Sequence, residues 1–221
     1  MTVDSDDTVF VALIGDIRGS REMDDRKGVQ AEFQRVVETL NDRVRDSAIA
    51  SPFTVTTGDE FQVLLTDARA AVEAAVTASD RFHPTRLRFG IGCGTLETDV
   101  NPDQAIGMDG PCFHRARAAI NAAQQDGAWL RVSGWSNGLD QHVNAMSDLV
   151  QCVREDWTDR QAEFAHTLME TGAQKHVAAH YDVSKSTVSE SLSAGHVQEV
   201  RAAENAVAAF LQEHLSGCET P

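Results

Sequence analysis

The order of the apolar runs in the first 132 residues constrains the fold more than any other feature of this chain. Residues 9–14 read VFVALI, a continuous β-branched run that has the length of a buried strand. A long helical pattern follows, and two short apolar runs at 53–56 and 60–65 then flank a glycine turn. A helix is expected over about 67–81, a strand over 86–94, a helix over about 112–125 and a last strand over 129–132. The order is therefore β-α-β-β-α-β with an α-β extension.

This order predicts an α+β protein whose first domain is ferredoxin-like. The sheet is expected to be mostly antiparallel, with its helices on one face. In such a sheet the first strand and the central hairpin lie side by side, so residues at the end of one can approach the tip of the other.

After about residue 134, every apolar pattern has helical spacing. Thr158 is a good N-cap for a new helix, and the residues that follow predict three short helices. The first ends near Gly172, and the third begins with Ser184 as its N-cap. We expect a first domain over 1–135, a linker helix over 136–156, and an all-α domain over 157–221 that ends in an amphipathic helix.

The composition is strongly acidic. The net charge is −15, from 34 Asp and Glu against 19 Lys and Arg, and the only lysines are Lys27, Lys175 and Lys185. Such a surface repels nucleic acid at long range and keeps a protein soluble in high salt. The composition therefore favours a halophilic protein over an ordinary acidic cytosolic one.

The chain shows no membrane or export signal. No apolar run reaches the roughly 18 residues that span a bilayer, and the N-terminus lacks a basic signal-peptide region. We expect a soluble, cytoplasmic protein with no membrane partner. The four cysteines form no CxxC pair, so free buried thiols are expected at Cys93, Cys112, Cys152 and Cys218.

Acidic residues occur where the predicted sheet brings two segments together. Asp16 ends the first strand, and Asp59 and Glu60 occupy the hairpin tip. Two carboxylates without a basic partner repel each other, and a divalent cation relieves that repulsion. The alternative for each acid is structural, because Gly-Asp is common in hairpins and an Asp after a strand is often a helix cap.

Glycines accompany these acids. Gly15 and Gly19 would let the backbone after the first strand approach a phosphate closely. Gly58 would supply the unusual dihedral angles of the hairpin turn. Together with the acids, they predict a metal and phosphate site at one edge of the sheet.

Four segments resemble known families in the same order. GDIRGS (15–20) resembles the "DIxGS" step of class III nucleotidyl cyclases, and TTGDEF (56–61) resembles their metal-bearing hairpin and the GGDEF box of diguanylate cyclases. LRFGIGCGTL (87–96) is similar to the cyclase strand "RIGIHTG", and MDGPCFHRARAA (108–119) to the segment "GxxVNxAARL". Over the whole chain the best resemblance is to the SatD-like family, which joins a cyclase-like domain to a helix-turn-helix.

This resemblance implies a set of site residues. Asp16 and Asp59 would be ligands of Mg²⁺ or Mn²⁺, assisted by the Ile17 carbonyl, in a two-metal mechanism. The residues implied or placed near a nucleotide or another phosphate ligand are Gly15, Arg18, Gly19, Ser20, Arg21, Gly58, Glu60, His114 and Arg117.

The chain also departs from the cyclase pattern. Val55 stands where many class III enzymes have a purine-selecting lysine. His114 falls on the cyclase Asn and Ala118 on its Arg, with Arg117 one residue out of register. Transition-state stabilisation needs donors placed to within about an ångström, so these changes bear on turnover more than on binding.

Residues 174–192, QKHVAAHYDVSKSTVSESL, resemble the helix-turn-helix of sigma-factor region four. The second helix of such a motif enters the major groove of DNA. The resemblance predicts DNA contacts, with an alternative role in protein contact. The residues concerned are Lys175, His176, Ser184, Lys185, Ser186, Thr187, Ser189 and Glu190.

The combined prediction is a two-domain regulator in which a metal-nucleotide domain controls a DNA-binding domain, with a homodimer as the expected assembly. Two other functions stay open. One is an active cyclase that uses ATP or GTP, and the other is a non-enzymatic protein-interaction adaptor.

Overall fold

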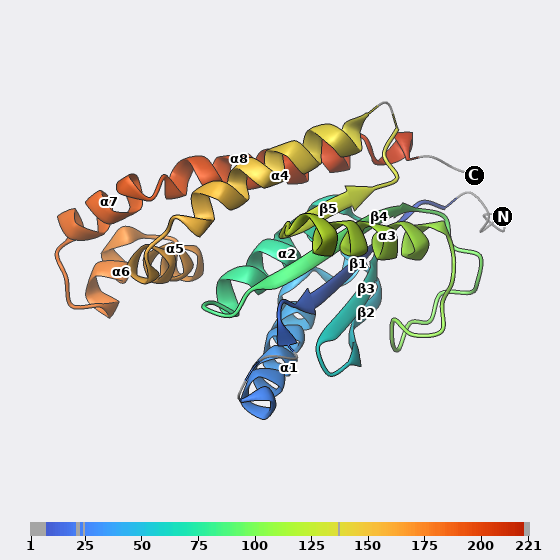
Figure 1. The fold of residues 1–221 in the computed structure, drawn as a ribbon, viewed down its shortest axis with the longest axis horizontal. Coiled ribbons are helices and arrows are strands. Elements are labelled where there is room, and N and C mark those ends of the chain that lie inside the picture. Colours follow the sequence, from blue (N-terminus) through green and yellow to red (C-terminus); the bar gives the residue numbers. More distant parts are fainter. Residues whose placement is uncertain (1–7, 21–22, 24, 137, 219–221) are drawn as a thin grey trace.

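A computed structural model describes residues 8–20, 23, 25–136 and 138–218 (Figure 1). Within them a sheet has the strand order β2-β3-β1-β4-β5, and only the β4–β5 pair is parallel. The strands are β1 (Phe10–Ile17), β2 (Ile49–Thr57), β3 (Glu60–Leu65), β4 (Leu87–Gly94) and β5 (Leu130–Ser133). The antiparallel order β2-β3-β1-β4 is the ferredoxin-like arrangement, so the predicted fold class is confirmed.

The helices cover both faces of the sheet, contrary to the prediction that they share one face. Helices α1 (Arg26–Arg43) and α2 (Ala68–Arg81) contribute to the large core on one side. Helix α3 (Pro111–Asp126) lies on the opposite side, where it forms a second, smaller cluster with residues of β1 and β3 (Figure 1). The predicted element order was right, but it did not indicate which face the third helix covers.

Glycines in β4 explain the position of α3. Gly90, Gly92 and Gly94 alternate along the strand and point to the same face. A Cβ on Gly90 or Gly92 would collide with the α3 backbone at Ala116, and one on Gly94 would lie 2.8 Å from the backbone nitrogen of Cys112. The missing side chains therefore let the helix backbone lie directly on the strand.

The rest of the chain is helical, as predicted. The helices are α4 (Leu139–Glu155), α5 (Asp159–Thr171), α6 (Gln174–His180), α7 (Lys185–Ala194) and α8 (Val197–Glu213). Thr158 and Ser184 are the N-caps of α5 and α7, and Gly172 ends α5 with a φ of 70°. None of the helices in the described part of the chain is long and apolar enough to cross a membrane.

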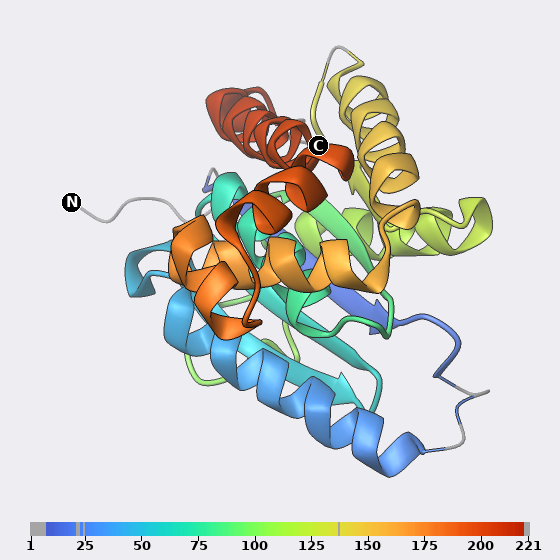
Figure 2. The same ribbon diagram turned by 90° about the vertical axis from the view of Figure 1, so that its left-hand side faces the viewer.

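Helices α5, α6 and α7 form a unit with its own core, which we call the three-helix unit. Its buried residues include Phe164, Val177, Val188 and Leu192. Helices α4 and α8 pack beside each other and contribute to the large core of the sheet domain (Figure 2). The segment predicted as a linker helix is thus a packed element. The domain boundaries themselves stay a prediction.

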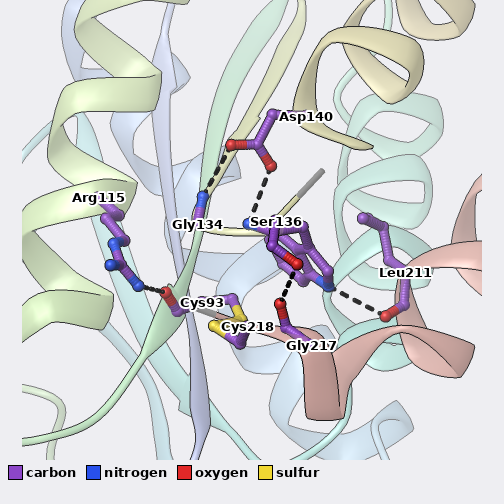
Figure 3. The surroundings of a disulfide bond; sticks show 9 residues. Cys93, Arg115, Gly134, Ser136, Asp140, Leu211, Gly217 and Cys218 are labelled. Carbon is purple, nitrogen blue, oxygen red and sulfur yellow. Dashed lines mark hydrogen bonds between the residues drawn. A yellow bond between two sulfur atoms is a disulfide. The ribbon is translucent and has the colours of Figure 1, made fainter. Parts of the chain in front are cut away.

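A disulfide joins Cys93 in β4 to Cys218 near the end of the chain (Figure 3). This corrects the expectation of four free thiols, which holds only for buried Cys112 and exposed Cys152. The Cα atoms of the bonded pair lie 6.1 Å apart, within the usual range for disulfides. The two residues are 125 positions apart, so their pairing depends on α8 returning the chain to the sheet.

Candidate metal and phosphate site

The end of β1 brings three charged side chains to one face of the sheet. Asp16 pairs in register with Glu60 of β3 on one side and with Arg88 of β4 on the other. Residues Ala12 and Ile14 of β1 belong to the cluster under α3, and side chains alternate along a strand. Asp16 therefore lies on the face that α3 covers, with one acid and one base as its neighbours.

Asp16 is the least satisfied of these groups. Its Oδ1 is buried and has no hydrogen-bond partner, while the Nε of Arg88 lies 3.6 Å away. Burial raises the pKa of Asp16 above its ordinary value, and this outweighs the opposing effect of Arg88. The neighbouring charges of Glu60 and Asp59 raise the pKa further. The carboxylate is thus placed where added positive charge would stabilise it.

Asp59 is held at the hairpin tip by the loop after β1. Its backbone carbonyl accepts a hydrogen bond from the Ile17 N–H at 3.0 Å, and its Oδ2 accepts one from the Ser20 hydroxyl at 2.6 Å. Thr57 donates to Oδ1 at 3.2 Å. The bond from Ser20 is the main cause that lowers the pKa of Asp59. Asp59 is therefore stabilised in its ionised form and turned toward the segment that follows Asp16.

Glu60 and Arg117 form a paired charge across the sheet and α3. The two guanidinium nitrogens of Arg117 donate to the two carboxylate oxygens of Glu60 at 2.5 and 2.8 Å. The hydrogen bond that Arg117 donates to Glu60 raises the pKa of Arg117. The one-residue shift in register therefore does not remove Arg117 from the site, because its side chain reaches the hairpin.

These residues fit a cation that arrives with an anionic ligand. Among the described residues, no group of three or more His, Cys, Asp or Glu side chains gathers as a metal site. The sequence analysis assumed that the acids have no basic partner. The structure corrects this, because Arg88 lies beside Asp16. Magnesium is typically bound by one or two carboxylates, and phosphate oxygens help to complete its coordination shell. The Oδ1 of Asp16, which has an ion pair but no hydrogen bond, fits that role.

The three predicted glycines serve different purposes. Gly19 has a φ of 71°, so the loop after β1 needs a glycine there. Gly58 is not among the glycines of positive φ, which corrects its predicted role, and a Cβ there would meet the side chain of Gln30. A Cβ on Gly15 would lie 2.6 Å from the Phe61 ring, so core packing accounts for that glycine.

Other predicted residues lie away from Asp16 or outside the described residues. His114 pairs with Asp109 at 2.6 Å, at the N-terminal end of α3, which lies beside Gly94 at the far end of β4 from Arg88. The Arg18 guanidinium donates to the Gly127 carbonyl at 3.2 Å, so it is directed toward α4 and β5. Arg21 lies outside the described residues.

The sequence analysis missed Arg88. This residue is only 8% exposed, and its Nη1 has no hydrogen-bond partner. A signal was present, because Arg88 shares its two-residue period with Gly90 and Gly92 in an otherwise apolar strand. A buried guanidinium nitrogen without an acceptor can bind an oxyanion.

The residues predicted to contact DNA are all exposed on the three-helix unit. The Ser184 hydroxyl caps α7 by accepting from the Thr187 N–H at 3.0 Å, and it also contacts the Ser186 hydroxyl at 2.7 Å. Lys185 and Glu190 are exposed on the same helix, and neither forms a salt bridge within the part of the chain that the structure describes. Their surface is available to a partner.

The chain belongs to the SatD family, whose model matches residues 10–209. A search of curated proteins found no match. The match to the family model confirms the family that the sequence motifs indicated.

Solved structures resemble the chain only distantly. A bacterial light-regulated adenylyl cyclase is 12% identical with a TM-score of 0.44, over 57% of this chain and 43% of its own length. The dimeric guanylyl cyclase domain of the RhoGC fusion protein from the aquatic fungus Blastocladiella emersonii is 15% identical with a TM-score of 0.40, over 52% of this chain and 73% of its own. Csm1 from T. onnurineus is 13% identical with a TM-score of 0.31, over 89% of this chain and 38% of its own length. Because these scores are below 0.5, no activity is transferred from them.

Proposed function

We propose that the chain binds a nucleoside triphosphate together with a divalent cation at the end of β1, and that this binding regulates DNA recognition by the three-helix unit. The observation that carries the first part is a pair of buried atoms without a hydrogen-bond partner, Asp16 Oδ1 and Arg88 Nη1, of which the first has only a 3.6 Å ion pair with Arg88 Nε. One needs positive charge and the other negative charge, and a metal–phosphate complex supplies both.

Each residue of the site has a part in this proposal. Asp16 and Asp59 would hold Mg²⁺ or Mn²⁺, which when bound neutralises the charge of the phosphates and the carboxylates. Arg88 would donate its free nitrogen to a phosphate oxygen, and Arg117 could exchange Glu60 for phosphate. Ser20 would have to rotate its hydroxyl away from Asp59 Oδ2, and the cation would replace that hydrogen bond.

Binding without turnover is the function that the residues favour. His114 lies at the other end of β4, and Val55 cannot hydrogen-bond a purine. An active cyclase is the alternative, and product formation from ATP or GTP with Mn²⁺ that is lost in Asp16→Asn would establish it. Absence of product with retained binding would support the regulator.

Thermal unfolding tests the binding site. Ligand binding to the native state stabilises it by about 2.7 kcal/mol at a hundred times Kd. We expect ATP or GTP with Mn²⁺ to raise the Tm of the wild type, and Asp16→Asn to abolish the rise. Asp42→Asn, on the exposed surface of α1, is the matched control and should keep it. No nucleotide-dependent rise in any variant would refute the site.

A second proposal, that α7 reads DNA, is supported by its exposed face and its capped N-terminus on a compact three-helix core. The charge opposes tight binding, because residues 157–221 contain four Lys and Arg against nine Asp and Glu. Phosphate contacts dominate affinity, so a single unit would bind weakly and a homodimer on two half-sites would bind better.

Selection from a random duplex library tests DNA binding. We expect an enriched site with two half-sites about 10 base pairs apart, or a multiple of that. Ser189→Ala should change the preferred bases, and Lys185→Ala should weaken binding, whereas Glu213→Ala on α8 should do neither. A library that stays random across a range of salt would favour the alternative of a protein-interaction adaptor.

A further inference from the structure

A cavity of about 240 Å³ lies between the sheet domain and the three-helix unit. The end of α2 and the start of β4 form one wall, the last turn of α4 forms another, and the start of α5 closes the third. Sites for drug-sized ligands occupy roughly 300–1,000 Å³, so this cavity suits a smaller molecule. Neither Asp16 nor Arg88 lines it.

Two indole rings line this cavity. The Nε1 of Trp129 donates to the Ser147 carbonyl at 3.0 Å, and that of Trp157 donates to the Gly195 carbonyl at 2.6 Å. Because both ring N–H groups are already satisfied, the rings offer the cavity only their carbon surface. The Arg154 guanidinium lies 5.9 and 5.3 Å from the two ring centroids, which adds a third flat group. Two indole rings with a guanidinium over them form flat walls, and these favour a planar ring.

Positive charge gathers at one end of the cavity. Arg86 donates to Glu155 Oε1 at 2.7 Å, Gln151 donates to the same oxygen at 3.0 Å, and Arg18 lies 3.8 Å from it. Two guanidinium groups therefore share one carboxylate oxygen.

The remaining charged groups of the lining are paired elsewhere. Arg154 is bound by Asp80 and Glu204, and Asp159 lies 3.8 Å from His83. Arg18 and Arg86 are thus the cations of the lining that share a single carboxylate oxygen, that of Glu155. An added oxyanion beside them would be stabilised by both.

We propose that this cavity binds a small aromatic anion, a planar ring that carries one carboxylate or phosphate. The ring would lie against Trp129 and Trp157, and the anionic group would contact Arg86 and Arg18. Since Trp157 and α5 form part of the wall, an occupied cavity would fasten the three-helix unit to the sheet domain. The inference needs neither the metal nor the triphosphate of the proposed function.

Tryptophan fluorescence of the full chain tests this binding. The chain has three Trp residues, and the third, Trp135, is 2% exposed with its Nε1 bound to Leu211. The probes are AMP, benzoate, adenosine and inorganic phosphate, with EDTA present to exclude metal. We expect AMP or benzoate to change the emission, with adenosine and phosphate about tenfold weaker because each lacks half of the recognised group. Response to AMP alone identifies a nucleotide, and to benzoate alone an aromatic carboxylate.

Variants separate this cavity from the Asp16 site. Arg86→Gln should weaken probe binding about tenfold. Arg45→Gln, whose side chain is 72% exposed and pairs with Asp67, is the matched control and should leave it unchanged. Asp16→Asn should also leave it unchanged, although that variant abolishes the metal-dependent triphosphate effect. The proposal is overturned if neither anion binds, if phosphate alone binds as well as AMP, or if Arg86→Gln binds normally.

Discussion

Two buried charge clusters in this protein differ in how completely their groups are paired. Asp80, Arg154, Arg201 and Glu204 form a buried ion-pair quartet that joins α2, α4 and α8. All four carboxylate oxygens of the quartet accept from a guanidinium. At the end of β1, by contrast, one oxygen of Asp16 and one nitrogen of Arg88 have no hydrogen-bond partner.

The difference indicates what each cluster does. A closed ring of four charges compensates its own desolvation, and here it sets the position of two C-terminal helices on the sheet domain. An incomplete cluster carries the cost of burial without full compensation, which an added ligand could supply. Burial and pairing together, and not charge alone, therefore distinguish the structural cluster from the candidate site.

The largest expected effect follows from opening the quartet. Asp80→Ala leaves two half-buried guanidinium groups with only Glu204 between them, and breaking a buried pair costs up to about 3–5 kcal/mol. Asp80 is 7% exposed and contacts both arginines, so solvent cannot replace it. Urea unfolding of the wild type and the variant measures this loss. Asp16→Asn, where pairing is already incomplete, should change the free energy of unfolding by less than about 1 kcal/mol.

A fourfold apolar variant sharpens the contrast. Replacing the whole quartet (Asp80→Leu, Arg154→Met, Arg201→Met and Glu204→Leu) removes every buried charge at once, and such replacements are often neutral. It should therefore be more stable than Asp80→Ala alone. If Asp80→Ala loses under about 1 kcal/mol, or the fourfold variant is the weaker of the two, the quartet is not the closed structural unit described.

A middle-sized effect concerns salt. The Debye length of the solution falls from about 10 Å at 0.1 M to about 3 Å at 1 M salt. Salt therefore screens exposed ion pairs strongly and buried ones much less. The coupling energy between Asp80 and Arg201, from a double-mutant cycle, should stay within about 0.5 kcal/mol over that range. The exposed pair Glu32–Arg35 on α1 is the control. Its coupling energy of a few tenths of a kcal/mol should vanish at the higher salt concentration. Equal salt dependence of the two couplings would contradict the buried assignment.

The sequence predicted the candidate site better than it predicted the quartet, and the reason is physical. Asp16 and Asp59 follow from strand order, because β1 must pair with the hairpin in a ferredoxin-like sheet. The quartet residues sit in three helices far apart in the chain, and helical period alone cannot show that α8 packs on α2 and α4. The disulfide between Cys93 and Cys218 depends on the same return of the chain.

Arg88 and Gly58 show the limits at the site itself. Arg88 was missed because an alternating strand does not indicate which charged residue will be buried beside an acid. The role of Gly58 was wrong because glycine in a hairpin suggests a positive φ, whereas the residue instead leaves room for Gln30 of α1. Both errors concern contacts between elements, which no local pattern contains.

The smallest effect is a pH dependence that has opposite signs at the two acids of the site. An unfolded Asp titrates near about pH 3.9. Asp16 has a raised pKa in the folded protein, so it stabilises the fold below that pH, and this contribution is lost as the pH rises through the folded pKa. Asp59 has a lowered pKa, so its contribution is present above about 3.9 and is lost as the pH falls through its folded pKa.

Unfolding free energies over a pH series test both signs with two variants. Asn cannot titrate, so Asp16→Asn serves as a reference without the ionisable group. The free energy of unfolding of the wild type relative to this variant should fall as the pH rises from about 4. Relative to Asp59→Asn it should instead fall as the pH drops below about 4. Arg88→Met should move the Asp16 window to higher pH, because Arg88 lowers the pKa of Asp16. Parallel slopes for the two Asn variants would mean that the two carboxylates share one environment. The contrast between a half-buried, incompletely paired acid and one whose ionised form is stabilised by Ser20 would then be wrong.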